Sequence, residues 1–444
     1  MKILLIGSGA REHAIARALS RSEQNPDIIC FASNNNPGIQ EHSSVFAMGK
    51  ISDPAAVTQF ADQHSTELAI IGPEAPLEAG VADALWETGI PCVGPKKALA
   101  QIETSKGFTR DLLTKYRIPA CPAYKRFSAM EGVREFLTEL HDNYVVKYDG
   151  LMGGKGVKVA GDHLHSHDEA LDYCMELVSR DGTFVVEEKL IGEEFSLMSF
   201  CDGEHLAHMP PVQDHKRAYD GDTGPNTGGM GSYSDADHSL PFLTDEEIAQ
   251  AQKFNQATAQ ALKEEFGDGY KGILYGGFIA TADGVKLIEY NARLGDPEAM
   301  NVLPLLQSDF MEVCMGMVNG NLDARDITFA HQATVCKYAV PKGYPDSPVK
   351  GECIDVSAIT DRDQLYYASV EARAGLLYEA GSRTAAYVGI AQTLTEAETT
   401  AEVEISKVGG PLFHRKDIGT EELVQKRIDH MNELRNHPQR RTVH

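Results

Sequence analysis

The first hundred residues alternate short apolar segments with helical segments, and this alternation constrains the fold more than any other feature of the chain. The apolar segments lie at residues 2–6, 27–32, 68–71 and 91–93. The helical segment after Gly7 carries Ile15, Ala18 and Leu19 on one side. Strands that alternate with helices form parallel sheets covered by helices. We therefore expect an α/β protein whose first domain, residues 1–104, is a Rossmann-like, doubly wound parallel sheet.

At 444 residues the chain is too long for one ordinary core, so further domains are expected. We expect a central domain at residues 105–325, with a small mixed α/β lid at about residues 123–190, and a C-terminal domain at residues 326–444. Ala333–Val340 and Thr384–Ile390 indicate an antiparallel β/α unit in the last domain. The segment 213–231 is rich in Gly and Asp and predicts a long irregular loop with a function. The tail, Arg427–His444, predicts a fraying helix.

The balance of charge excludes some partners. Lys and Arg number 41 against 65 Asp and Glu, a net charge of -24. Such a field repels nucleic acid, so an anionic substrate must be met by local basic clusters. The eight cysteines form no Cys-x-x-Cys pair, which favours reduced thiols. The N-terminal apolar run is too short for a secretion signal, and no segment reaches the length of a membrane span. We expect a cytoplasmic enzyme.

A predicted hairpin carries polar side chains suited to a metal. It runs from Gly272–Ala280 through a turn at Asp283–Gly284 into the segment 287–298. Alternation along the second strand puts Glu289, Asn291 and Arg293 on one face. Two oxygen ligands beside a guanidinium suit Mg²⁺ held against phosphate oxygens. The alternative is the polar outer face of a half-exposed strand.

A glycine-rich loop offers a place for phosphate. A strand delivers Lys147, and the loop then presents the backbone of Gly153 and Gly154 together with Lys155. Backbone amides and ammonium groups are what a polyphosphate needs. The spacing is not that of a P-loop, and by itself such a loop is often only a turn. The strand at 185–190 and Glu194, which follow at a suitable distance, favour the nucleotide interpretation.

Several segments together resemble the phosphoribosylamine–glycine ligase family, ATP-grasp enzymes of purine biosynthesis. The resemblance covers roughly residues 1–420. It depends on the order of the segments 7–14, 72–77, 105–108, 150–157, 213–217, 222–231, 289–298 and 415–419. It implies an N-terminal doubly wound sheet, a central ATP-grasp fold with its lid, which closes over ATP, and a C-terminal antiparallel domain.

The resemblance also implies a reaction. Glycine is joined to the amine of 5-phosphoribosylamine while ATP becomes ADP and phosphate, through glycyl phosphate. Lys106, Lys147 and Lys155 would meet the phosphates, and Glu289 and Asn291 would hold Mg²⁺ or Mn²⁺. Catalysis would then consist mainly of positioning and electrostatics.

Further roles are implied for residues along the nucleotide. Glu187 and Leu190 would receive adenine, and Glu194 the ribose hydroxyls. Without the family, a solvated strand end is the favoured interpretation of Glu187. Arg293 and Asp296 would meet the acyl phosphate and the incoming amine, although Asp296 before Pro297 also suits a plain turn.

The two other substrates are assigned in the same way. Asp214 and Lys216 would bind glycine, while His215 either joins them or is a positioning or core residue. The resemblance implies that the sugar phosphate is bound by Gly9, at a helix N-terminus, and by Glu12, Glu74 and Arg383. Lys342 either joins them or lies on the protein surface.

The chain departs from the family pattern at three positions. Gly277 stands where many ATP-grasp proteins have a second metal-binding carboxylate, and Gly154 and Ser382 also differ from the familiar members. These changes leave the metal preference open.

Three alternative functions are considered: another ATP-grasp ligase or carboxylase, an NAD-dependent dehydrogenase and a nucleotide sensor. The first domain lacks the third glycine that the dehydrogenase motif requires. We expect small-molecule partners only, and a monomer or a small homo-oligomer.

Overall fold

The first domain is the expected parallel sheet. The computed structural model describes residues 1–152, 156–180 and 182–436. The strand order is β3-β2-β1-β4-β5, and all pairs are parallel. The strands are β1 Lys2–Ile6, β2 Asp27–Ala32, β3 Val45–Met48, β4 Leu68–Ile71 and β5 Cys92–Val93. β3 was not predicted, although its four residues are all apolar, because it is a short edge strand that is only partly buried.

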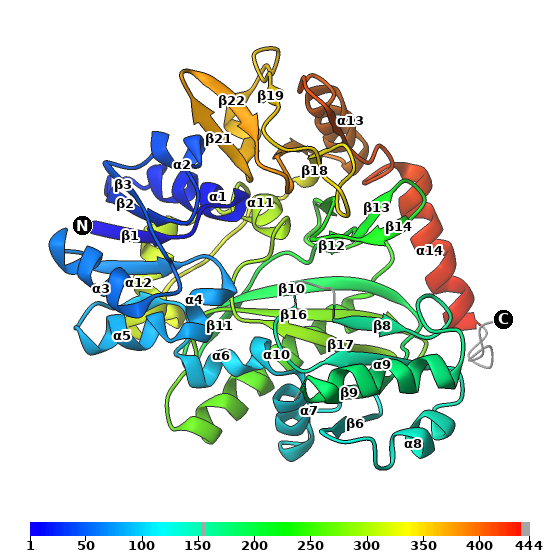
Figure 1. Cartoon of the computed structure of the whole chain (residues 1–444). Coiled ribbons are helices and arrows are strands. Elements are labelled where there is room, and N and C mark those ends of the chain that lie inside the picture. Colours follow the sequence, from blue (N-terminus) through cyan, green and yellow to red (C-terminus); the bar gives the residue numbers. More distant parts are fainter. Residues whose placement is uncertain (153–155, 181, 437–444) are drawn as a thin grey trace.

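Six helices accompany this sheet: α1 Ala10–Ser20, α2 Pro37–Glu41, α3 Pro54–Gln63, α4 Glu74–Ala79, α5 Val81–Glu87 and α6 Lys97–Thr104. Helix α7 (Lys106–Lys115) then leads into the second domain, and its N-cap Ser105 accepts the backbone N–H of Phe108. The helices cover both faces, as the alternating pattern predicts (Figure 1).

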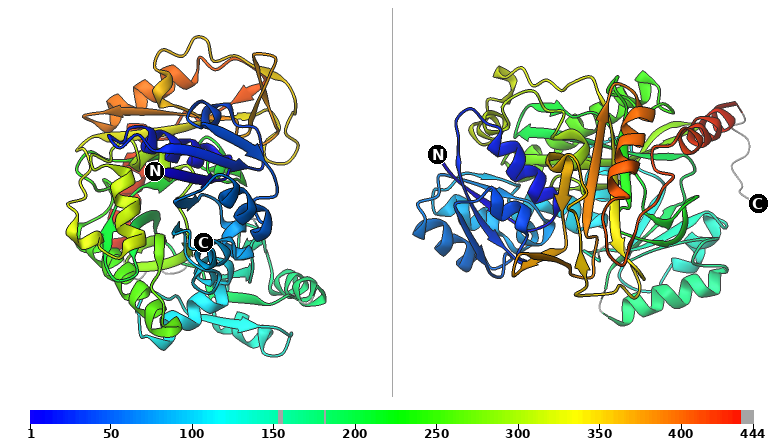
Figure 2. Two further views of the ribbon diagram at one scale, coloured as in Figure 1. Left: turned by 90° about the vertical axis from the view of Figure 1, so that its left-hand side faces the viewer. Right: turned by 90° about the horizontal axis from the view of Figure 1, so that it is seen from above.

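The lid is a separate four-stranded antiparallel sheet with its own core. Its order is β6-β9-β7-β8, from β6 Tyr124–Phe127, β7 Tyr144–Tyr148, β8 Val157–Val159 and β9 Phe184–Glu188. Helices α8 (Val133–Glu139) and α9 (His167–Ser179) pack on it around Phe184 and Tyr144. Both views of Figure 2 show the lid as a projection from the rest of the molecule.

The central sheet holds the predicted hairpin. Its order is β11-β10-β16-β17, from β10 Glu193–Asp202, β11 Leu206–His208, β16 Lys271–Thr281 and β17 Gly284–Asn291. The 22-residue helix α10 (Asp245–Phe266) covers one face, beginning with a capping box between Thr244 and Glu247. Helices α11 (Glu298–Val302) and α12 (Phe310–Asn319) follow the hairpin.

The segment 213–231 is not irregular, and that prediction was wrong. It forms β12 Gln213–Asp214, a hairpin of β13 Arg217–Tyr219 and β14 Thr223–Asn226, and the start of β15 Gly231–Ser234. These pieces are short and glycine-rich, so no alternation marks them in the sequence. β13 pairs with β14 and β12 pairs with β15, and only β15 has a strand partner far along the chain, β18.

The last large sheet joins the central and C-terminal parts of the chain. Its order is β12-β15-β18-β23-β20, with β18 Ala333–Pro341, β20 Leu365–Tyr367 and β23 Ala385–Ala391, and β24 Leu412–Phe413 pairs with β18. Its strands are antiparallel, as expected. Since β12 and β15 precede residue 326, the sheet crosses the division drawn from the sequence.

The remaining elements complete this end of the molecule. A small sheet has the order β19-β22-β21, from β19 Cys353–Ile354, β21 Val370–Arg373 and β22 Leu376–Glu379. Helix α13 (Leu394–Ile405) packs on β18 and β23. The tail helix α14 begins at Glu421, before the predicted Arg427, and is described to Asn436 (Figure 1).

Candidate functional site

A β-bulge sets the direction of Glu289. In the β16–β17 pair Gly277 lies opposite Glu289 and Phe278 opposite Leu287, so Ile288 is an extra residue. Strict alternation would put Leu287 and Glu289 on the same face. The bulge instead lets Leu287 join the buried core beneath α10 while Glu289 reaches the opposite, polar side. Gly277 lies directly across from Glu289 and, as a glycine, offers no side-chain ligand.

Lysines gather around the Glu289 carboxylate. Lys216 Nζ lies 3.9 Å from Glu289 Oε1, and the two side chains are 43% and 37% exposed. Burial raises the pKa of Glu289, but the charges of Lys216, Lys106 and Lys147 outweigh it, and the pKa falls below its ordinary value. The carboxylate is therefore ionised at neutral pH, in a partly open, cation-rich place.

Lys147 is held by a buried ion-pair network. Its Nζ lies 2.7 Å from Glu187, whose carboxylate Arg110 grips through two hydrogen bonds of 2.8 and 2.9 Å. Burial raises the pKa of Glu187, but Arg110 and Lys147 lower it to about 2. Arg110 also donates to the carbonyl of Ile288 at 2.7 Å. The interpretation of Glu187 as part of a solvated strand end is therefore wrong. The next residue, Glu188, is the exposed one.

Arg110 was missed by the sequence analysis. It lies in an amphipathic helix with no motif of its own, and its partners are 77 and 178 residues away along the chain. The other residues predicted to bind the nucleotide lie nearby. Leu190 is partly buried between β9 and β10, and Glu194 lies 3.9 Å from Lys216.

The glycine-rich loop is described only in part. Lys106 opens α7, and its Nζ donates to the carbonyl of Gly150 at 3.2 Å. This brings the start of the loop to the same side as Lys147. Gly153, Gly154 and Lys155 lie outside the described residues, and their roles stay predictions.

Arg293 is fixed by two carboxylates and an amide. Its Nη2 is 2.9 Å from Glu103 and 3.1 Å from Asn291 Oδ1, and its Nε is 3.6 Å from Glu74. Glu103, at the end of α6, also accepts the N–H of Ala292 at 2.7 Å. The sequence analysis missed Glu103 because only the folded chain brings α6 to the end of β17.

Asp296 does more than shape a turn. Its carboxylate accepts a 2.6 Å hydrogen bond from Tyr338 and lies 3.2 Å from Arg383. Arg383 donates in addition to the carbonyls of Gly228 (2.7 Å), Gly229 (3.1 Å) and Asp296 (2.9 Å). Arg383 thus ties the C-terminal sheet to the segments around Asp296 and Gly229.

The backbone from Asp214, the last residue of β12, to Lys216 turns three predicted glycine ligands to different sides. Asp214 and Lys216 face the Glu289 side, and burial followed by the charge of Glu298 raises the pKa of Asp214. His215 faces the other way, where its ring is 5.8 Å from that of Tyr233. Burial, then Arg427 and Arg415, lower its pKa to about 3. Its burial favours a core position for His215, but neither ring nitrogen has a hydrogen-bond partner among the described residues, and a role in glycine binding stays a prediction.

Glu12 occupies the helix N-terminus beside Gly9. Its carboxylate accepts the Gly9 N–H at 2.5 Å and lies 2.6 Å from Arg11. A side chain at Gly72 would collide with it, so Glu12 fills the gap between the loops after β1 and β4. Only 2% of Glu12 is exposed, whereas the nearby Glu74 is about two-fifths exposed.

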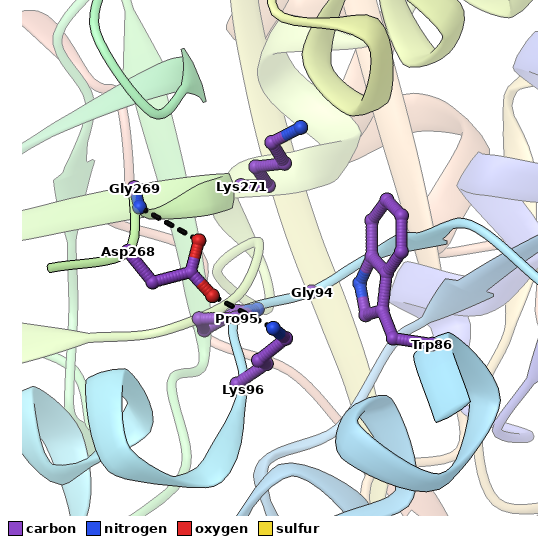
Figure 3. Close-up of a pocket in the computed structure, with 7 residues that line it drawn as sticks. All are labelled: Trp86, Gly94, Pro95, Lys96, Asp268, Gly269 and Lys271. Carbon is purple, nitrogen blue, oxygen red and sulfur yellow. Dashed lines mark hydrogen bonds and ion pairs between the residues drawn. The ribbon is translucent and has the colours of Figure 1, made fainter. Parts of the chain in front are cut away.

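Two other candidate places are separate from this site. A cavity of about 80 Å³ lies between α5 and β16, lined by Trp86, Gly94, Pro95, Lys96, Asp268, Gly269 and Lys271 (Figure 3). Its lysines have partners already: Lys96 pairs with Asp268 at 2.7 Å, and Lys271 donates to a backbone carbonyl at 2.7 Å. The group Asp202, His205 and Asp323 has the spacing of metal ligands. However, Asp202 accepts three backbone N–H groups, so it mainly stabilises turns.

Family models cover most of the chain. The N domain of phosphoribosylglycinamide synthetase matches residues 1–103, the ATP-grasp (A) domain matches 104–299 and the C domain matches 334–421. The phosphoribosylamine–glycine ligase of Methanosarcina acetivorans is 52% identical over 435 residues, 98% of each chain. That of Methanocaldococcus jannaschii is 51% identical and covers 98% of this chain and all of its own length.

Solved structures agree. The phosphoribosylamine–glycine ligase of Thermotoga maritima has a TM-score of 0.81 at 27% identity, over 94% of this chain and all of that one. A biotin carboxylase from Campylobacter jejuni has a TM-score of 0.74 at 13% identity, over 97% and 98% of the two chains, which shows a shared fold alone. Among the described residues, no helix has the length and apolar character needed to span a membrane. The chain belongs to the phosphoribosylglycinamide synthetase family.

Proposed function

We propose that this enzyme joins glycine to 5-phosphoribosylamine, with conversion of ATP to ADP and phosphate, to give glycinamide ribonucleotide. The observation that carries the proposal is a group of lysines near Glu289. Lys216 lies 3.9 Å from its carboxylate, Lys147 donates to the adjacent carbonyl of Ile288 at 3.4 Å, and Lys106 contacts the start of the glycine-rich loop. A carboxylate reacts poorly as an electrophile, and phosphorylating it brings several negative charges together. Several cations beside a carboxylate that binds a metal would stabilise these negative charges.

Glu289 and Asn291 fit a divalent cation. They offer a carboxylate and an amide oxygen from the same strand end, both hard ligands of the kind Mg²⁺ and Mn²⁺ accept. Gly277 opposite adds no ligand, so phosphate oxygens and water would supply the other ligands. The bound ion would neutralise phosphate charge, and Lys147 and Lys106, with Lys155 from the loop, would hold the phosphates from the lid side.

Glycine would lie at Asp214 and Lys216. Asp214 and the buried Glu298 are two carboxylates close enough to raise the pKa of Asp214. The ammonium group of glycine supplies the positive charge that this pair lacks, and Lys216 meets the glycine carboxylate. One carboxylate oxygen then attacks the γ-phosphorus, the bond to ADP breaks, and glycyl phosphate forms.

The amine would arrive from the first domain. Gly9, Glu12, Glu74 and Arg383 would frame the sugar phosphate. The amine nitrogen attacks the carbonyl carbon of glycyl phosphate, phosphate leaves with the bonding electrons, and the nitrogen loses a proton. Arg293 would stabilise the charge that develops on the acyl phosphate, and Asp296, oriented by Tyr338, would align the amine.

Adenine would lie against Glu187 and Leu190, and its ribose would contact Glu194.

The proposal also includes the domain division, the partners and the location. The domains are residues 1–104, 105–325 and 326–444. The partners are small molecules, the protein is a monomer or small homo-oligomer, and its location is cytoplasmic.

Omission of each substrate tests the reaction. ADP is measured with ATP, Mg²⁺, glycine and freshly made phosphoribosylamine, and then with glycine or the amine left out. We expect ADP release to require glycine. Release that is indifferent to both substrates would reject the ligase. Glycine labelled with ¹⁸O in its carboxylate tests the intermediate, because glycyl phosphate must pass one labelled oxygen to inorganic phosphate.

A further inference from the structure

The segment Arg415–Gly419 is part of the family resemblance but has no role in the reaction above. It lies between β24 and α14, and only 1% of the Arg415 side chain is exposed. Arg415 grips Asp417 through two hydrogen bonds of 2.9 and 2.7 Å. Its remaining nitrogen donates to the carbonyl of Arg217 and to Asp222, both at 3.1 Å. Arg415 therefore joins the C-terminal segment to the β13–β14 hairpin.

The tip of this hairpin is held at several more points. Gly221 N donates to Asp417 at 2.8 Å, and Lys416 N donates to Asp220 at 3.0 Å. Asp222 has a φ of 58°, which is uncommon for a residue with a side chain. Its carboxylate is also paired with Arg427 of α14. The hairpin turn is thus fixed by groups about two hundred residues further along the chain.

The base of the same hairpin carries the proposed glycine site. Asp214 and Lys216 precede β13, and Thr227 after β14 donates twice to the carbonyl of Lys216, from its N–H at 2.7 Å and from its hydroxyl at 2.8 Å. A Cβ atom at Gly229 would lie 2.6 Å from Asp214 Oδ1. The two ends of the hairpin therefore meet at the site, and a shift of the tip moves Lys216 relative to Glu289.

Buried ion pairs of this kind add little net stability compared with apolar packing, but the loss of one partner leaves an uncompensated buried charge. We propose that Arg415 is a positioning residue: it holds the β13–β14 hairpin so that Asp214 and Lys216 face Glu289. This inference depends on the proposed assignment of Asp214 and Lys216 to glycine. Arg415 itself touches no substrate in this account.

The test compares Arg415→Gln with Arg435→Gln. Arg435 lies on α14 and pairs with Glu247 of α10 at 2.8 Å, so its loss removes a similar ion pair away from the hairpin. Because a displacement near 1 Å can cost about a hundredfold in rate, we expect Arg415→Gln to raise the KM for glycine about tenfold or more. The affinity for a non-hydrolysable ATP analogue with Mg²⁺ should stay unchanged, and Arg435→Gln should leave both quantities unchanged.

Two outcomes overturn the proposal. One is an equal change of glycine KM in both variants, and the other is an unchanged glycine KM in Arg415→Gln. If Arg415→Gln does not fold, Asp222→Asn removes the hairpin's side of the contact, and it must raise the glycine KM as well. The unaltered enzyme, assayed for glycine-dependent ADP release, tests the proposed function separately.

Discussion

Two charged clusters of this molecule use the same residue types in different ways. Around Glu289, Lys216 stands 3.9 Å away and both side chains are more than a third exposed. Around Arg415, partners lie at 2.7 to 3.1 Å and the guanidinium is nearly inaccessible. Charged groups that lie far apart and are exposed can still form hydrogen bonds to a ligand. Charged groups that are close together and buried already use their hydrogen-bonding atoms on one another. The first cluster is therefore suited to binding, and the second to holding a binding element in place.

The largest expected effect is at the open cluster. Glu289→Gln removes the carboxylate that we propose binds the metal. Because a bound metal ion stabilises the charge of the transition state by several kcal/mol, kcat/KM should fall about a thousandfold or more. Steady-state ADP release at several Mg²⁺ concentrations measures it. Glu371→Gln, at the half-exposed pair with Arg373, is the matched control and should change nothing. Full activity of Glu289→Gln would remove this residue from the metal site.

An intermediate effect is expected at Lys147, which links the open cluster around Glu289 to the buried ion pairs of Glu187. Lys147→Ala removes one cation from the phosphates, and since a charged hydrogen bond contributes roughly 1.5–3 kcal/mol, the KM for ATP should rise about ten- to a hundredfold. Lys158→Ala on the neighbouring strand of the lid, where Lys158 covers the Tyr173 ring, should leave that KM unchanged. Similar KM values for ATP in both variants would count against the placement of Lys147.

The smallest expected effect is the response of the buried Glu187 network to acid. Its pKa of about 2 lies below the ordinary 4.5, so its ion pairs stabilise the fold above pH 4.5 and lose that contribution as the pH falls toward 2. Urea unfolding at pH 7 and pH 3 should show the stability gap between wild type and Glu187→Gln narrowing by about 2 kcal/mol at the lower pH. A gap that stays constant or widens would show that Glu187 is not held as described.

Local patterns predicted the elements that are long or continuously apolar. Strands β1, β2, β4 and β5 of the first sheet and the β16–β17 hairpin follow from apolar segments and turn residues, whereas β3 was missed. Glu289 and Asn291 follow the bulge at Ile288, so their own alternation is undisturbed, but the bulge interrupts the alternation between Leu287 and Glu289. No local signal marks that extra residue.

Contacts between distant segments could not be predicted. Arg110, Glu103 and Tyr338 act through partners that the chain reaches only after folding, from surroundings that look like ordinary amphipathic or apolar elements. The short strands of 213–231 exist because β18 and the C-terminal segment support them. His215 was left open because the two-residue strand that turns it away from Asp214 has no pattern long enough to read.

The most direct test of the account is the position of the divalent ion. Crystals grown with Mn²⁺, glycine and a non-hydrolysable ATP analogue, and measured at the manganese edge, locate it by anomalous scattering. We predict an anomalous peak in direct coordination with Glu289 and Asn291 and with the terminal phosphates of the analogue. A peak only at the Asp202, His205 and Asp323 group, with Glu289 facing solvent, would contradict the account.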